Sequence, residues 1–210
     1  MPMLILASAS PRRRELLAQA GYVFEVRPAH VNEDARPGEN AIAYVTRLAR
    51  EKAEAVYNRE QGDLGTREQK DTGPDADAAV EGLVVLGADT TVEVDGQILA
   101  KPEDAADAAR MLRLLSGRTH RVITGVAVVT ARGAHVAAEV TGVKFLTLSE
   151  AEIAAYVATG EPMDKAGAYG IQGRAARWIP RVEGCYFNVV GLPLALVSTM
   201  LEGIKAASSF

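Results

Sequence analysis

Three consecutive arginines near the N-terminus are the first residues whose types and spacing predict chemistry. They occupy positions 12–14 and follow Ser8, Ser10 and Pro11. Serine is a preferred N-cap and proline suits the first position of a helix, so we expect a helix to begin here. Cations at a helix N-terminus are slightly unfavourable unless an anion is present. Serine hydroxyls, free backbone N–H groups and guanidinium groups together predict a phosphate site, with a solvated basic turn as the alternative.

Two carboxylates are candidates for holding a divalent cation. Asp89 lies at the polar carboxyl end of a buried strand expected over 83–91, and Glu33 lies in a polar loop. Ligands of α/β proteins bind beyond the carboxyl ends of strands, and Mg²⁺ prefers oxygen ligands. The sequence therefore predicts a cation site at Asp89 and Glu33, with an Asx turn at Asp89 as the alternative.

Basic side chains spread along the chain would neutralise phosphate oxygens as negative charge builds during attack. Lys52 interrupts the apolar stripe of a helix expected over 40–57, so either its stem extends outward or its ammonium reaches into a cleft. Lys101 precedes Pro102 at the expected start of another helix, where a cation is mildly unfavourable. The candidate phosphate-neutralising residues are Arg12, Arg13, Lys52, Lys101 and Lys165.

A glycine-dense segment over 166–173 is a candidate ligand-binding loop. Its glycines allow the backbone to approach a ligand closely. Gln172 carries both a donor and an acceptor, which suits the edge of a nucleobase. The segment does not match the Walker phosphate loop, and that pattern occurs nowhere in the chain. A flexible linker is the alternative, which the tyrosine and isoleucine of the segment disfavour.

These candidates must be positioned by strands that alternate with helices, a pattern that predicts an α/β protein with a mixed twisted sheet flanked by helices. Asp95-Gly96 predicts a two-residue hairpin turn, and Ser149 with Glu152 predicts a capping box. Strands are expected at 3–6, 22–27, 83–91, 91–94, 97–100, 121–130, 134–146 and 183–190. Helices are expected from Pro11 to Gly21, over 40–57, from Pro102 to Gly117, over 149–160 and at the C-terminus.

Length, net charge and apolar content exclude several classes of protein. The length of 210 residues is typical of one domain. The net charge of −4 argues against the wide basic surface that binding to nucleic acid requires. The chain contains no run of 18 apolar residues, the length that would predict a membrane-spanning helix. We therefore expect a soluble, cytoplasmic protein with no nucleic-acid or membrane partner. Cys185 is interpreted as a small buried residue within a strand.

The segment 58–81 differs from the rest of the chain. It is rich in Gly, Asp, Glu, Gln and Thr and has almost no large apolar residue. Because it has little apolar surface to bury, we expect a mobile surface insertion within a single domain spanning 1–210.

Taken together, several blocks resemble the Maf family of nucleotide pyrophosphatases. They occur in the family's order and cover the whole chain apart from 58–81. Two departures are the length of that insertion and Ala100, which stands where many relatives have glycine. The matching blocks are 7–13 (ASASPRR), 87–90 (GADT), Lys101-Pro102, Ser116-Gly117, 164–173 (DKAGAYGIQG) and 190–193 (VGLP).

The resemblance implies a fold like that of the inosine-triphosphate pyrophosphatases, with two lobes around a cleft. It implies hydrolysis of a nucleoside triphosphate to the monophosphate and pyrophosphate with Mg²⁺ or Mn²⁺, in the branch acting on dTTP and UTP, and a homodimer. It assigns Asp89 as proton acceptor and Arg12, Thr90 and Gln172 to specificity. The family's remaining phosphate-binding and metal-binding positions correspond to Ser8, Arg13, Glu33, Lys52, Lys101 and Lys165. Ser10, the expected N-cap, is a further candidate for phosphate binding.

The resulting hypothesis is attack of water at the α-phosphorus, with Asp89 as the general base or chiefly as a metal ligand. Gln172 would read a uracil-type edge, and Arg12 would serve either base or phosphate. Three alternatives stay open at this point. They are a nucleotide sensor that regulates cell division, the same reaction on modified or purine triphosphates, and a structural phosphate-binding domain.

Overall fold

One mixed sheet runs through the part of the chain that the computed structural model describes, residues 3–68 and 82–207. Its strands are β1 (Met3–Leu6), β2 (Glu25–Val26), β3 (Leu83–Val94), β4 (Gln97–Leu99), β5 (Thr119–Thr130), β6 (Gly133–Lys144) and β7 (Arg181–Glu183). The strand order is β2-β1-β3-β5-β6-β7, with β4 paired to β3. β1 is parallel to β2 and β3, and the other pairs are antiparallel. The predicted α/β class and mixed sheet are confirmed.

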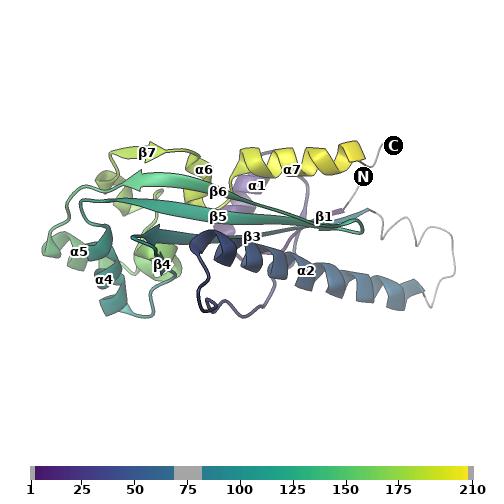
Figure 1. The fold of residues 1–210 in the computed structure, drawn as a ribbon, viewed down its shortest axis with the longest axis horizontal. Coiled ribbons are helices and arrows are strands. Elements are labelled where there is room, and N and C mark those ends of the chain that lie inside the picture. The colour runs from purple at the N-terminus through teal and green to yellow at the C-terminus, as the bar shows by residue number, and fades with distance from the viewer. Residues whose placement is uncertain (1–2, 69–81, 208–210) are drawn as a thin grey trace.

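Helices flank this sheet. They are α1 (Pro11–Gln19), α2 (Ala41–Glu68), α4 (Ala105–Leu115), α5 (Glu150–Val157), α6 (Tyr186–Val190) and α7 (Leu194–Ala207), with 3-10 helices η1 (Glu161–Asp164), η2 (Ala166–Ala168) and η3 (Arg174–Trp178). In Figure 1, α2 runs along one side of the long strands and α7 along the other, while α4 and α5 gather at one end. Two predicted helix starts are confirmed, the Ser10 cap of α1 and the Ser149–Glu152 capping box of α5.

Two glycines allow the backbone of α2 to lie directly on β3 and β5. A Cβ on Gly87 would lie 2.2 Å from the carbonyl oxygen of Ala49, and one on Gly125 would lie 2.3 Å from that of Val45. No side chain fits in this space, so only glycine permits the approach. The predicted stripe of α2 faces the same interface. Its members Ala41, Val45, Leu48, Lys52 and Val56 are all buried.

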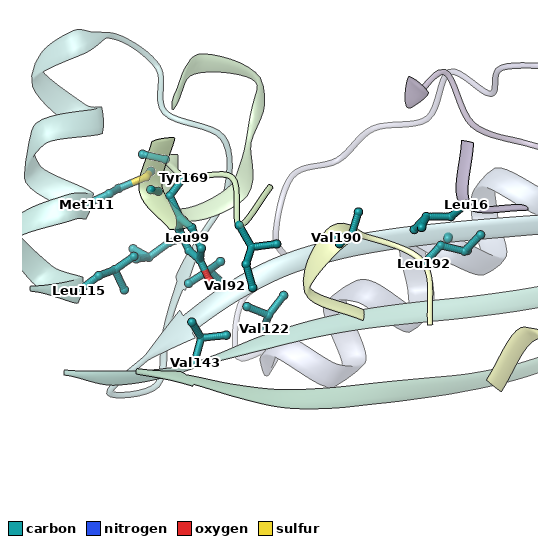
Figure 2. Close-up of a cluster of buried hydrophobic side chains, with 14 of the residues drawn as sticks. Leu16, Val92, Leu99, Met111, Leu115, Val122, Val143, Tyr169, Val190 and Leu192 are labelled. Atoms are coloured by element: carbon teal, nitrogen blue, oxygen red, sulfur yellow. The ribbon is translucent and has the colours of Figure 1, made fainter. Parts of the chain in front are cut away.

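The opposite face of the sheet carries the larger hydrophobic core. Side chains alternate along a strand, so β3 presents Val85 to the α2 side and Leu86 and Ala88 to the larger core. Figure 2 shows part of this core. Tyr169, Met111 and Leu99 lie at one end of the view, and Leu16, Val190 and Leu192 lie at the other. The same alternation sends neighbouring polar residues of β3 to different faces.

The predicted position of Asp89 at the end of a strand is wrong. β3 continues past Thr91 to Val94, so Asp89 lies in the middle of a twelve-residue strand. The polar residues stay in the strand because β3 pairs with β5 along this whole length, with Asp89 opposite Gly125. The confirmed hairpin follows only afterwards, with Asp95 and Gly96 both at positive φ.

The strand predicted over 183–190 is also wrong. β7 ends at Glu183, the first residue of the predicted strand, and the segment then forms the short helix α6. Asn188 holds this helix on the sheet, because its Nδ2 donates to the Val122 carbonyl and to Thr141 Oγ1, each at 2.9 Å. Cys185 precedes the helix and is only half-buried, so its expected place within a buried strand is corrected as well.

Several predicted element boundaries differ from those in the structure. α2 does not end near Tyr57 but continues to Glu68, so the first part of the predicted 58–81 insertion is helical, and 69–81 lie outside the described residues. The helix predicted from Pro102 begins at Ala105, because Asp104 caps it instead. β2 is shorter than the predicted strand 22–27. Among the described residues, no helix is long and apolar enough to cross a membrane.

Gly125→Ala should lower the free energy of unfolding by more than about 2 kcal/mol, because α2 must move off the sheet to admit the Cβ. Gly142→Ala is the matched control on a neighbouring strand, where a Cβ meets nothing closer than 3.7 Å. We expect the control to change stability by less than about 1 kcal/mol. Urea unfolding of both variants checks this, and equal losses would contradict the account of the α2 interface.

Candidate functional site

A cleft of about 580 Å³ opens where β3 extends past the end of β1. β1 ends opposite Leu86, and β4 pairs with β3 only from Val92, so among the described residues the edge of β3 between them has no strand partner on this side. The structure brings all eleven predicted site residues to the lining of this cleft. They are Ser8, Ser10, Arg12, Arg13, Glu33, Lys52, Asp89, Thr90, Lys101, Lys165 and Gln172.

Lys52 joins the two candidate carboxylates. Its Nζ lies 2.7 Å from Asp89 Oδ1 and 2.6 Å from Glu33 Oε1. Of the two readings of Lys52 from the sequence, the structure therefore supports the one in which the ammonium reaches the cleft. The side chain arrives there because α2 lies so close to β3, and Asp89 is on the α2 side of that strand.

The two carboxylates have opposite pKa shifts. Burial raises the pKa of Asp89 above its ordinary value, and Lys52 and Arg13 offset this only in part. Burial acts in the same direction on Glu33, but the hydrogen bond and charge of Lys52, helped by Lys101 and Arg13, hold the pKa of Glu33 below its ordinary value. The cleft thus contains one carboxylate with raised proton affinity beside one that stays ionised.

The loop that carries Glu33 is held by two residues of α2 that sequence reasoning missed. Tyr44 Oη donates to the Glu33 carbonyl at 2.9 Å, and Arg47 Nη2 donates to the Asp34 carbonyl at 3.0 Å. Arg47 also forms a two-point ion pair with Glu39, which lowers the pKa of Glu39 to about 2. Tyr44 and Arg47 lie three residues apart and therefore on one face of α2. The carbonyl groups that they bind lie in an irregular loop, which no local sequence pattern predicts.

Arg13 is held at the cleft by neutral acceptors. Its Nε donates to the Gly191 carbonyl at 2.9 Å, its Nη1 to Ser8 Oγ at 3.2 Å and its Nη2 to Thr90 Oγ1 at 3.0 Å. Burial lowers the pKa of Arg13 from its ordinary value, although a guanidinium remains charged at neutral pH. Ser10 caps α1 by accepting from the Arg13 N–H at 3.5 Å. These bonds fix the orientation of a cation that lacks a carboxylate partner among the described residues.

Asp164 pairs with two of the predicted phosphate-binding cations. Its Oδ2 lies 3.2 Å from Arg12 Nη1, and its Oδ1 lies 2.5 Å from Lys165 Nζ. Burial acts to raise the pKa of Asp164, but Lys165 and Arg12 outweigh it and bring the pKa below its ordinary value. By contrast, Lys101 is exposed and has no ion-pair partner in the described part of the chain.

Gln172 lies on a loop that is held by a buried tyrosine and a half-buried glutamate. Tyr169 belongs to this loop, and its buried hydroxyl is 2.8 Å from His120 Nε2. Glu161, which sequence reasoning missed, accepts from Tyr156 Oη at 2.9 Å and would clash with any Cβ on Gly173. The loop therefore needs a glycine beside Gln172, whose own side chain is exposed.

The arrangement combines an anion-binding surface with a poised base. Five basic and four acidic side chains line the cleft, and Arg13 and Lys101 are the basic ones without a carboxylate partner in the ranges described. A buried carboxylate of raised pKa among cations is a common arrangement at catalytic sites. The geometry suits proton transfer beside a bound phosphate chain.

Comparison with known proteins gives a consistent family. The family model described as Maf-like protein matches residues 3–204. The dTTP/UTP pyrophosphatase of Koribacter versatilis is 50% identical over 199 residues, covering 95% of this chain and 93% of that protein. The dTTP/UTP pyrophosphatase of Hahella chejuensis is 50% identical over 204 residues, covering 96% and 93%.

Among solved structures, the Staphylococcus aureus Ham1 protein is similar over 96% of this chain and 98% of its own. The sequence identity is 13% and the TM-score is 0.45.

The buried His120 should make stability depend on pH. Burial lowers its pKa from 6.5 to about 4, so between these values the unfolded chain binds the proton and the folded chain does not. On acidification from pH 7 to 4, the wild type should lose about 3 kcal/mol more free energy of unfolding than His120→Gln, which cannot titrate. Glutamine also keeps a donor near the Tyr169 hydroxyl. Urea unfolding across this range checks the difference, and parallel curves would refute it.

Proposed function

Because the chain belongs to the Maf-like protein family, we propose that it hydrolyses dTTP and UTP to the nucleoside monophosphate and pyrophosphate. Relatives that are 50% identical over nearly their whole length bear the name dTTP/UTP pyrophosphatase, which supports both reaction and substrates. The observation that carries the proposal is the buried Asp89 carboxylate, held by Lys52 in a cleft lined with cations.

Asp89 is the proposed general base. Its Oδ1 is bound to Lys52, whereas its Oδ2 has no hydrogen-bond partner among the described residues and is available to a water molecule. The raised pKa increases the affinity of this carboxylate for the proton of the attacking water. Arg13 and Lys101 would bind the phosphate chain directly, while Arg12 and Lys165 would exchange Asp164 for phosphate oxygens.

A divalent cation, Mg²⁺ or Mn²⁺, is the proposed cofactor. Glu33 and Asp89 each give one oxygen to Lys52. Glu33 Oε2 is then free for the ion, and Asp89 Oδ2 either binds the ion or accepts the proton of the attacking water. No group of three metal-ligating side chains forms among the described residues, so water and phosphate oxygens would complete the coordination, as is common for Mg²⁺. The two carboxylates fit this mode of binding. A bound ion would neutralise charge on the phosphate oxygens.

Gln172 is the proposed reader of the base, with Arg12 and Thr90 as the other specificity residues. Its exposed amide has no hydrogen-bond partner in the described part of the chain, yet its loop is anchored by Tyr169 and Glu161. A free amide on a fixed loop can form directed hydrogen bonds with a pyrimidine edge. The homodimer implied by the resemblance and the cytoplasmic location expected from the sequence stay predictions.

Asp89→Asn should lower kcat by about 10²- to 10⁴-fold, because the amide cannot accept the proton. Pyrophosphate release from dTTP measures this. Asp95→Asn is the matched control, the same change in the β3–β4 turn outside the cleft, and should retain wild-type activity.

An Asp89→Asn protein within threefold of the wild type would contradict the role of Asp89. A titration with Mg²⁺ separates the two functions of this residue. A loss that persists at saturating Mg²⁺ supports the general base, whereas activity restored by high Mg²⁺ would show that Asp89 is chiefly a metal ligand.

Gln172→Ala should lower kcat/KM for dTTP and UTP roughly tenfold more than for CTP and GTP, because it removes hydrogen bonds that only the preferred bases form. Gln97→Ala, an exposed glutamine of β4 outside the cleft lining, is the control. Kinetics with the four triphosphates measure the ratio. Equal losses for all four would refute base recognition by Gln172.

A further inference from the structure

A pair of threonines lies directly across the β3–β5 ladder beside the cleft. Thr90 of β3 is opposite Thr124 of β5, and their Oγ1 atoms are 2.9 Å apart. Thr124 is fully buried, and its Oγ1 also lies 3.2 Å from the Asn188 carbonyl oxygen. Thr90 lines the cleft, and its Oγ1 has two further neighbours, Arg13 Nη2 at 3.0 Å and the Gly191 carbonyl oxygen at 3.4 Å.

The number of protons in this cluster limits what Thr90 offers to a ligand. A hydroxyl donates one hydrogen bond and accepts two, a guanidinium only donates and a carbonyl only accepts. If Thr124 donates to Asn188, then Thr90 donates to Thr124 and keeps one lone pair free. If Thr124 donates to Thr90 instead, Thr124 and Arg13 occupy both lone pairs of Thr90, and its proton goes to the Gly191 carbonyl or to a ligand. Only in the first arrangement does Thr124 take the single proton of Thr90, and only there does Thr90 keep a lone pair for a ligand.

The first arrangement is favoured by geometry. It gives the Asn188 carbonyl oxygen its donor, and it uses the 2.9 Å contact between the hydroxyls rather than the 3.4 Å contact with Gly191. A buried carbonyl without a donor costs free energy, and short hydroxyl–hydroxyl contacts are the stronger ones. Arg13 then donates to Thr90, Thr90 to Thr124, and Thr124 to Asn188.

We propose that Thr124 is a positioning residue that makes Thr90 a hydrogen-bond acceptor toward the ligand. The proposal rests on the proposed function. Phosphate oxygens are acceptors, so the partner of Thr90 is not the phosphate chain but an N–H or O–H group of the nucleoside. In dTTP that donor is either N3–H of the base or the 3′-hydroxyl of the sugar. Cytosine lacks the first donor and a dideoxy sugar lacks the second.

Thr124→Val tests this role, because valine keeps the shape and removes the hydroxyl that accepts from Thr90. Thr124→Ser retains a hydroxyl and is the rescue variant. Thr141→Val is the matched control, since Thr141 is equally buried and contacts Asn188 without touching Thr90. The readouts are two ratios of kcat/KM, UTP over CTP for the N3–H donor and dTTP over 2′,3′-dideoxythymidine triphosphate for the 3′-hydroxyl.

We expect one of these ratios to fall about five- to tenfold in Thr124→Val, because the freed Thr90 hydroxyl can then also donate to an acceptor. Which ratio falls identifies the donor. Both ratios should stay within about twofold of the wild type in Thr124→Ser and Thr141→Val, whatever their stability. A common loss for all substrates in Thr124→Val, with both ratios unchanged, would overturn the proposal.

Failure of the proposed function is recognised separately, as absence of pyrophosphate release by the wild type. In that event the same ratios are measured as dissociation constants of UMP, CMP, dTMP and 2′,3′-dideoxythymidine monophosphate by calorimetry. Unchanged binding ratios in Thr124→Val would again overturn the role of Thr124.

Discussion

The close approach of α2 to the sheet determines the geometry of the cleft. Carbonyl oxygens of α2 occupy the space where Cβ atoms of Gly87 and Gly125 would lie, so helix and sheet are closer than any side chain would permit. Asp89 lies two residues beyond Gly87 on the same side of β3, and Lys52 extends from the same helix to meet it. An additional methyl group at either glycine would separate these charges, so the distance between Lys52 and Asp89 depends on a backbone contact outside the cleft.

The charges of the cleft are largely paired before any ligand arrives. Lys52 is shared by two carboxylates, and Asp164 occupies Arg12 and Lys165. Burying unpaired charges costs several kcal/mol, so this pairing keeps a half-buried, highly charged site compatible with a stable fold. A triphosphate can replace Asp164 on its cations without leaving any of them unsatisfied, and the cleft is therefore organised for an anion of high charge.

The sequence indicated which residues form the site more reliably than how they are held. All eleven candidates line one cleft. They could be recognised because a helix cap, a glycine-rich loop or a charge in an apolar stripe is visible in a short stretch of sequence. Asp89 was expected near the end of a strand over 83–91 because the apolar run gives way to polar residues there, whereas pairing with β5 continues the strand beyond them. The pairing of Arg12 with Asp164 joins residues 152 positions apart, which no local pattern predicts. The helix at Tyr186 has the β-branched and aromatic residues of a strand and depends on the tertiary bonds of Asn188.

The most direct test of the account is to incubate the wild-type protein with a panel of nucleoside triphosphates and Mg²⁺ or Mn²⁺, and to assay pyrophosphate separately from orthophosphate. Attack at the α-phosphorus predicts equal amounts of pyrophosphate and monophosphate, with dTTP and UTP as the best substrates. Release of orthophosphate with a diphosphate product would contradict the proposed point of attack. Binding of nucleotides without any pyrophosphate would contradict the enzyme and favour a nucleotide sensor.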